Sequence, residues 1–317
     1  MDLWVDTRWE GRHGIGRYAR EVSSRLTLQW RPLDLKGSPA ASTGALSRVP
    51  NGIIYSPGYN AFLRAKRQVI TIHDLIHLQA PWPGRAKYLA YYNAVLKPIV
   101  KRNGVVITVS ETSRQAIATW LNDPSVDIVN AGLGASAAFS VEMSPIESST
   151  PYLLYVGNLR AHKNICVALE AMSLLPNARM RMLVPASEHA EVLRRCSDLN
   201  IADRVELLPE MTDPELARQY RGAAATVMPS ILEGFGLPAL ESVMSGTPVL
   251  FWQGCAAVAE TVGARGTAVQ GSHDADEWAS VMNGALSDPQ RVEPPSGSYD
   301  WATTATAVER VLSSVGP

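Results

Sequence analysis

Short apolar stretches separated by amphipathic ones run along the whole chain of 317 residues. The apolar stretches are rich in valine, isoleucine and leucine, which is typical of buried parallel strands. Strands are predicted at residues 3–6, 52–56, 69–74, 105–110 and 126–130 in the first half, and at 152–157, 180–185, 205–209, 225–230, 248–252 and 267–270 in the second. Because these strands alternate with helical patterns, the sequence predicts an α/β fold with two parallel sheets wrapped by helices.

A polar stretch without periodicity, residues 141–150, separates the two sets of strands and is the predicted linker. We therefore expect one domain at residues 1–143 and a second at 144–300. Residues 301–317 form a closing segment, in which Trp301, Ala305 and Val308 recur at helical spacing. The sequence leaves open whether this helix crosses back to the first domain.

Composition narrows the class of protein. The chain has no apolar run of about 18 residues, so no transmembrane helix is predicted. Its acidic start is unlike a signal peptide. The three cysteines, Cys166, Cys196 and Cys255, are far apart in sequence and fit a reducing cytoplasm better than a disulfide frame or a zinc site. A cytoplasmic protein without a nucleic-acid partner is expected.

The net charge of −1 hides an asymmetry between the two halves. Residues 1–148 hold 17 basic and 11 acidic side chains, whereas residues 149–317 hold 12 and 19. The helical pattern at residues 85–102, which Pro98 should kink or divide, carries part of the positive charge. A basic first half suits peripheral contact with an anionic membrane or an anionic acceptor, and it equally suits ordinary solvated charge.

The most informative stretch follows the predicted strand at residues 225–230. It reads Glu233-Gly234-Phe235-Gly236-Leu237-Pro238-Ala239-Leu240-Glu241. The glycines permit a tight turn, and Pro238 suits the first turn of a helix. A strand, a glycine turn and a helix N-terminus form an anion site, since backbone N–H groups and the helix dipole face the ligand. Two carboxylates beside such a site need partners such as sugar hydroxyls.

This stretch resembles the paired-glutamate signature of retaining family-4 nucleotide-sugar glycosyltransferases. The flanking Tyr220-Arg221-Gly222-Ala223-Ala224 and Ser245-Gly246-Thr247-Pro248-Val249 are also similar to the family pattern. The resemblance implies the GT-B fold, with two Rossmann-like domains whose parallel sheets face each other across a cleft. The first domain would bind the acceptor and the second the nucleotide-sugar donor.

The resemblance also implies roles for the residues of this stretch. Glu233 would lie beside the donor sugar, and Glu241 would accept hydrogen bonds from the ribose. The backbone around Gly234, Phe235, Gly236 and Leu237 would hold diphosphate oxygens. No divalent metal or other cofactor is expected, and Asp274 is predicted to cap a helix instead of holding an ion.

Another candidate turn, which carries positive charges, lies near the start of the second domain. It reads Gly157-Asn158-Leu159-Arg160-Ala161-His162-Lys163-Asn164. A cation here would stabilise the negative charge that develops on a diphosphate leaving group. Lys163-Asn164 is similar to the Lys-Asn pair of the family, which makes Lys163 a candidate diphosphate ligand. Either Arg160 or His162 would supply a second cation. The turns after Val184-Pro185 and Leu208-Pro209-Glu210 are expected to line the base pocket.

Two motifs of the first half complete the candidate site. His73 ends a predicted strand, at the edge where ligands bind in parallel sheets, and His73-Asp74-Leu75 is similar to the family pair whose histidine contacts the donor sugar. Asp74 would orient the imidazole or cap the loop. Gly14-Ile15-Gly16-Arg17-Tyr18 resembles the first glycine loop of the family, where Gly16 would lie by the donor phosphates or the acceptor.

The sequence therefore predicts a retaining glycosyltransferase that transfers a hexose from a nucleoside diphosphate sugar to a saccharide or lipid-linked acceptor. The motifs lean towards bacterial cell-surface polysaccharide enzymes, many of them mannosyltransferases that use GDP-mannose. One alternative is an NAD(P)-dependent oxidoreductase, because Gly14-x-Gly16-x-x-Ala19 also fits a dinucleotide fingerprint, although residues 7–13 separate it from its strand. Another is a non-catalytic protein that binds sugar nucleotides.

Overall fold

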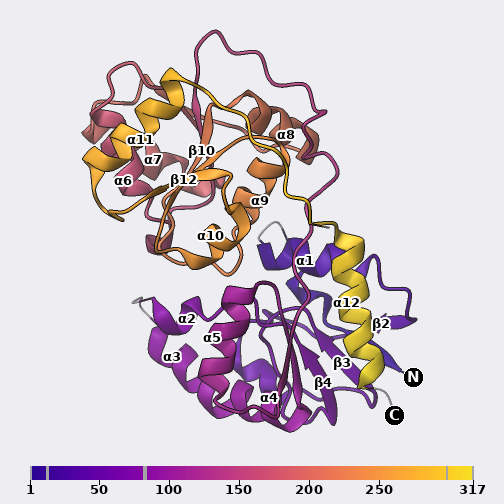
Figure 1. Cartoon of the computed structure of the whole chain (residues 1–317). Coiled ribbons are helices and arrows are strands. Elements are labelled where there is room, and N and C mark those ends of the chain that lie inside the picture. The colour runs from indigo at the N-terminus through magenta and orange to yellow at the C-terminus, as the bar shows by residue number, and fades with distance from the viewer. Residues whose placement is uncertain (1, 12–13, 81–83, 298, 316–317) are drawn as a thin grey trace. The chain divides into compact units, whose positions relative to one another are not determined.

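The chain forms two compact α/β units (Figure 1). The computed structural model describes residues 2–11, 14–80, 84–297 and 299–315. The first unit consists of Met1–Gly134 and Ser298–Pro317, and the second of Ala135–Gly297. Each unit has a parallel sheet of its own, as the sequence predicted. None of the helices within the described ranges has the length and apolar character needed to span a bilayer.

The first unit is built on strands that run in parallel, in the order β2-β1-β3-β4 followed by the pair β5-β6. A bridge between Thr71 and Ile107 joins the two sets. The strands are β1 (Leu3–Val5), β2 (Trp30–Pro32), β3 (Ile53–Ser56), β4 (Arg67–Ile70), β5 (Val105–Thr108) and β6 (Asp127–Asn130). The sequence missed β2, because this short strand is mostly exposed and ends in a proline, so it has no apolar pattern.

The helices of the first unit are α1 (Gly14–Ser23), α2 (Ile76–Gln79), α3 (Arg85–Tyr91), α4 (Lys97–Asn103), α5 (Glu111–Leu121) and α12 (Trp301–Ser314). The short helical turns η1 (Thr7–Trp9) and η2 (Ser42–Leu46) also belong to it. The helix predicted at residues 85–102 is divided by a π-helical turn, η3 (Tyr92–Leu96). The N–H of Lys97 donates to the carbonyl of Tyr92 there. The next residue, Pro98, has no N–H to donate.

The closing helix α12 lies with the first unit and packs beside α1. The Glu309 carboxylate accepts hydrogen bonds from the backbone N–H groups of Thr27 and Leu28. At its start, Trp301 lies so close to Gly134 that a Cβ on this glycine would collide with the backbone of Trp301. The point where the chain leaves the first unit is thus fixed by a contact that only glycine permits.

The second unit has one six-stranded parallel sheet in the order β12-β11-β10-β7-β8-β9. Its strands are β7 (Leu153–Val156), β8 (Met180–Leu183), β9 (Val205–Leu207), β10 (Ala225–Met228), β11 (Val249–Trp252) and β12 (Gly266–Val269). Its helices are α6 (Ile165–Ser173), α7 (His189–Asp198), α8 (Asp213–Gly222), α9 (Leu237–Met244), α10 (Ala256–Val262) and α11 (Ala275–Ser287), with the short turns η4 (Ala161–Lys163) and η5 (Ala186–Glu188). Asp274 caps α11 by accepting the N–H of Glu277, as predicted.

The polar stretch at residues 141–150 is attached to the second unit. Arg221 donates to the carbonyl of Met143, and the N–H of Ile146 donates to the carbonyl of Arg218. The ring of Phe139 also packs edge-on against Tyr220 at 5.8 Å. Because these contacts hold the segment on α8, the compact units divide after Gly134, earlier than the boundary that we placed after residue 143.

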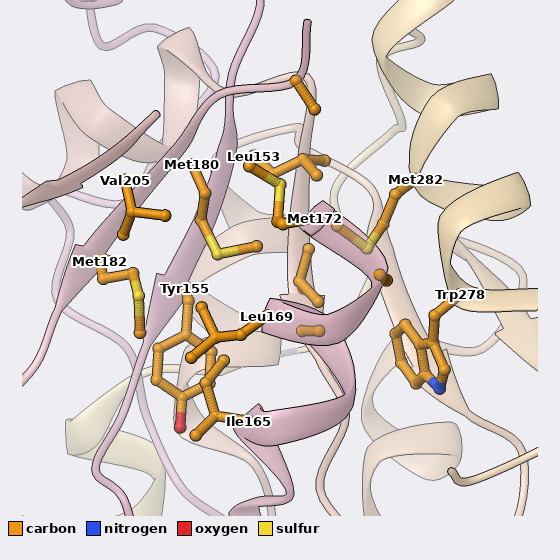
Figure 2. Close-up of a cluster of buried hydrophobic side chains, with 14 of the residues drawn as sticks. Leu153, Tyr155, Ile165, Leu169, Met172, Met180, Met182, Val205, Trp278 and Met282 are labelled. Atoms are coloured by element: carbon orange, nitrogen blue, oxygen red, sulfur yellow. The ribbon is translucent and has the colours of Figure 1, made fainter. Parts of the chain in front are cut away.

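The core of the second unit is rich in methionine (Figure 2). Met180 and Met182 from β8 and Met172 from α6 lie beside Leu169, while Trp278 and Met282 enter from α11. Leu169 is fully buried, whereas Leu174, just after α6, is 49% exposed. The flexible methionine side chains fill the spaces between sheet and helices.

We predict that Leu169→Ala destabilises the second unit by about 2–5 kcal/mol, because it opens a cavity in this core. The control Leu174→Ala should change stability by no more than about 0.5 kcal/mol, because this side chain lies at the surface and is 49% exposed. Urea denaturation followed by circular dichroism measures both changes. Equal losses for the two variants would contradict this placement of the core.

Candidate functional site

The strand order of the second unit reverses at β7. From β7 the chain continues to β8 and β9 on one side, whereas β10, β11 and β12 lie on the other. In parallel α/β sheets, ligands bind outside the carboxyl ends of the strands at such a switch point. The loops that leave β7 and β10 contain residues 157–164 and 229–236. The two segments to which the sequence assigned the donor are therefore neighbours in the fold.

The segment from β10 to α9 has the predicted order of strand, glycine turn and helix. Gly236 has a φ of 93°, which favours glycine, and α9 begins at the next residue with Pro238 in its first turn. The carbonyl of Phe235 accepts a hydrogen bond of 2.8 Å from Thr261, a residue of α10. The backbone of Gly236 and Pro238 and the hydrogen bond from Thr261 thus fix the start of α9. Its first amides lie at the carboxyl edge of the sheet.

Lys163 and Glu233 form an ion pair across the two loops. The Nζ of Lys163 lies 2.6 Å from Oε1 of Glu233, and the two side chains are only 16% and 9% exposed. The N–H of Ile231 donates to the carbonyl of His162 at 2.7 Å, which ties the same loops together through the backbone. The two residues predicted to contact diphosphate and sugar are therefore bonded to each other in this structure.

The loop after β7 is held by its own short contacts. A Cβ on Gly157 would lie 2.8 Å from the hydroxyl of Tyr155, so a larger residue would disturb this turn. The carboxylate of Glu188, in η5, accepts the N–H of Leu159 at 2.8 Å. Arg160 is exposed on this loop, while His162 is half-buried. Both lie beside Lys163 in the chain, so the identity of the second cation stays a prediction.

Glu241 lies in α9 and is buried, with 4% of its surface exposed. The hydroxyl of Tyr220, at the end of α8, donates to its Oε2 at 3.1 Å. The sequence predicted Glu241 as a ribose ligand and gave Tyr220 no role, because the two residues come from different helices.

Cys255 is a second residue that the sequence did not connect with this site. Burial raises the pKa of its thiol to about 12, and the negative charge of Glu233 adds to this rise. The thiol is therefore neutral at physiological pH and lies close enough to Glu233 to sense its charge.

In the first unit, His73 follows β4 at the carboxyl edge of the sheet. Its Nε2 lies 2.9 Å from the carbonyl of Pro57, and because a carbonyl only accepts, Nε2 carries the hydrogen. The ring of Tyr18 meets the imidazole edge-on at 4.7 Å. Asp74 accepts the N–H of Ile76, so it caps the loop, which is one of the two roles left open above.

Gly16 lies in the first turn of α1 and not in a loop. A Cβ at this position would lie 2.5 Å from the backbone of Gly11, so packing alone demands a glycine here. The turn η1 separates β1 from α1. This arrangement differs from a dinucleotide fingerprint, in which the glycines lie directly between strand and helix. Arg12 and His13 lie outside the described residues.

A buried polar cluster, defined as Asp6, Arg8, Trp9 and Asn60, lies at the same edge of the first sheet. Asp6 is fully buried and accepts two hydrogen bonds from Arg8, at 2.6 and 2.8 Å, and one from Asn60 at 2.7 Å. Trp9 donates to the amide oxygen of Asn60. No local sequence pattern marks this cluster, because Asn60 lies far along the chain from Asp6, Arg8 and Trp9.

Comparison with known proteins assigns a family to most of the second unit. The family model described as "Glycosyl transferases group 1" matches residues 139–296. These residues form a glycosyl transferases group 1 domain. The match includes both loops of the candidate donor site, with Lys163, Glu233 and Glu241.

Two curated relatives extend this group 1 likeness towards the first unit. The chain is 32% identical over 237 residues to the D-inositol 3-phosphate glycosyltransferase of Thermobispora bispora, which covers 66% of this chain and 55% of the relative. It is 29% identical over 228 residues to O-antigen chain mannosyltransferase B of Escherichia coli, which covers 67% of this chain and 60% of that protein. The chain thus spans little more than half the length of these relatives.

A solved structure has the same fold as this chain. Anabaena HepE, determined in complex with UDP and glucose, matches 99% of both chains with a TM-score of 0.71 at 16% sequence identity. The chain has the GT-B fold, as the motif resemblance implied.

Proposed function

We propose that this protein is a retaining glycosyltransferase that transfers a sugar from a nucleoside diphosphate sugar to a saccharide or lipid-linked acceptor. The observation that carries the proposal is the meeting of Lys163 and Glu233 at the switch point of a group 1 domain, beside the glycine turn that starts α9. A cation, two carboxylates and a helix N-terminus are the groups that a diphosphate joined to two sugars requires.

Each group has a distinct task in this proposal. Lys163 and the first amides of α9 bind the diphosphate, and Arg160 or His162 adds a second positive charge. The diphosphate competes with Glu233 for Lys163, so donor binding releases Glu233 towards the sugar ring. Glu241 binds the ribose. His73 contacts the donor sugar, as the resemblance to the family implies. Gly16 lets the start of α1 approach the donor phosphates or the acceptor.

This proposal assigns no nucleophile and no general base to the donor sugar, so the transfer takes place on one face of the sugar. The bond between the anomeric carbon and the diphosphate oxygen breaks, and the acceptor oxygen bonds to that carbon on the same face. The acceptor proton passes to the departing phosphate oxygen. Lys163 stabilises the negative charge on the leaving group, and Glu233 stabilises the positive charge on the sugar. The proposal includes no divalent metal, so activity should survive a chelator.

The donor and acceptor are proposed from the relatives' names. One relative is named a mannosyltransferase and another a glycosyltransferase for D-inositol 3-phosphate. We propose mannose from GDP-mannose as the first donor to test, in a cytoplasmic pathway of polysaccharide or glycolipid synthesis. An anionic acceptor would suit the basic first half of the chain.

We predict that one nucleoside diphosphate among GDP, UDP, ADP and TDP raises the melting temperature of the protein. A ligand at a hundred times its Kd adds about 2.7 kcal/mol to the stability of the folded state, which corresponds to a rise of a few degrees. Lys163→Met should abolish the rise. The control Arg179→Met should keep it, because Arg179 is exposed just before the amino end of β8. A rise with NAD alone would instead support the oxidoreductase.

We predict different kinetic effects for the two glutamates. Glu233→Gln should lower kcat by roughly 100-fold or more, because its charge acts on the transition state. Glu241→Gln should raise KM for the donor by roughly tenfold and leave kcat within a few-fold, because a ribose contact is made equally in both states. Release of nucleoside diphosphate from the donor measures both. Equal changes in both constants for the two variants would rule out this division.

We also propose that the first unit contacts an anionic membrane through a patch formed by Leu46, Leu63 and the neighbouring cations. These leucines are 65% and 43% exposed, and the N–H of Leu63 donates to the carbonyl of Ala45. Residues 35–73 contain no acidic side chain. The exposed cations of this segment are Lys36, Arg48, Arg64, Lys66 and Arg67. Exposed leucines among cations suit a surface of anionic lipid.

We predict that the protein sediments with vesicles containing phosphatidylglycerol and stays in solution with phosphatidylcholine alone. Arg64→Gln with Lys66→Gln should weaken binding roughly 30-fold, since each cation near an anionic surface contributes about 1 kcal/mol. The control is Leu174→Gln with Leu193→Gln, which removes two exposed leucines of the acidic second half. Binding that is equal for both double variants would refute this surface.

A further inference from the structure

Two buried side chains, one from α8 and one from α9, form a hydrogen bond with each other. Tyr220, in the last turn of α8, is fully buried, and its hydroxyl donates to Oε2 of Glu241 at 3.1 Å. Glu241 is itself 4% exposed. A carboxylate withdrawn from water stays ionised only where hydrogen-bond donors replace the lost hydration. The Tyr220 hydroxyl supplies such a donor at a defined place.

The position of Tyr220 is fixed on several sides. Its backbone carbonyl accepts a hydrogen bond of 2.7 Å from Thr247, in the turn after α9, and Arg291 holds the same threonine hydroxyl at 2.8 Å. The Tyr220 ring packs edge-on against Phe139. A ring held in this way cannot follow the carboxylate if the carboxylate rotates, so the hydroxyl is a fixed reference point.

This hydrogen bond controls the orientation of the Glu241 carboxylate towards a ligand. The terminal torsion of a glutamate is broad and is set mainly by its contacts. A hydrogen bond to Oε2 fixes this torsion and therefore the direction in which Oε1 points. Two neighbouring ribose hydroxyls need both oxygens of a carboxylate at defined angles, so orientation determines the strength of that contact.

We propose that Tyr220 is a positioning residue, which orients the Glu241 carboxylate for the ribose hydroxyls of the nucleotide donor. This inference rests on the proposed function and adds to it a residue that selects ribose over deoxyribose. A buried tyrosine that only filled space would contribute to stability but not to this selection.

The test compares the Kd of GDP, UDP and ADP with that of their 2′-deoxy forms, by titration calorimetry. The wild-type protein should prefer the ribonucleotide that it binds by roughly tenfold, the value of one hydrogen bond to a charged group. Tyr220→Phe removes only the hydroxyl and should reduce this preference to less than about threefold. Glu241→Gln should reduce it as well, because the charge on the acceptor is lost.

Tyr152→Phe is the matched control. Tyr152 is a buried tyrosine of the same unit, and its hydroxyl donates to the carbonyl of Gln219, the residue before Tyr220. This variant should keep the full preference for the ribonucleotide. Phe139→Leu, which removes the ring beside Tyr220 without touching either hydrogen-bonding group, should lower the preference part of the way and serves if Tyr220→Phe does not fold.

The outcomes separate the two proposals. If none of GDP, UDP, ADP and TDP binds the wild-type protein, the proposed function fails. If nucleotides bind but Tyr220→Phe, or in its place Phe139→Leu, keeps the wild-type preference, the role of Tyr220 is overturned. Equal weakening of ribo- and deoxynucleotide by Tyr220→Phe would also overturn it, because that result describes a structural contribution. A wild-type protein that binds both forms equally would show that the ribose contact itself is absent.

Discussion

The parallel pairing of β7 with β10 is the constraint on which the candidate site depends. Thr226 lies opposite Leu154 in this pair, so two strands far apart in sequence end side by side. Because the strand order reverses between these two strands, their loops border the crevice where ligands bind in parallel α/β sheets. Lys163 and Glu233 occupy these loops, and their ion pair is a direct consequence of the strand order.

The ion pair also lowers the cost of withdrawing two charged side chains from water. A lysine that is 16% exposed loses much of its hydration, and an opposite charge at 2.6 Å restores part of that loss. The thiol of Cys255, whose pKa is raised by burial, is neutral and adds no charge beside the pair. The charges of Lys163 and Glu233 therefore compensate each other, and in the proposed function the donor diphosphate exchanges with Glu233 at Lys163.

The segments that connect the units are held by close contacts of glycines and by hydrogen bonds from arginines. Gly134 touches the start of α12 in the first unit, and Gly246, with a φ of 71°, lies against Val141 and the carbonyl of Val292 in the second. Arg221 and Arg291 hold the neighbouring backbone through carbonyl oxygens. The sequence pattern Ser245-Gly246-Thr247 therefore has a structural task as well as its place beside the donor motif, since Thr247 also holds Tyr220.

The amino-acid sequence by itself determined the features that arise from neighbours along the chain. A strand lies at each place where an apolar stretch predicted one. Gly236 and Pro238 predicted the start of α9, and Asp274 predicted the cap of α11. Local torsions and capping decide these elements. The exposed β2 lacked such a pattern. Only the tertiary structure decided that Lys163 bonds to Glu233, that Tyr220 holds Glu241, and that α12 lies with the first unit. These contacts join residues remote in sequence, so strand order and helix packing set them, and no local pattern records either.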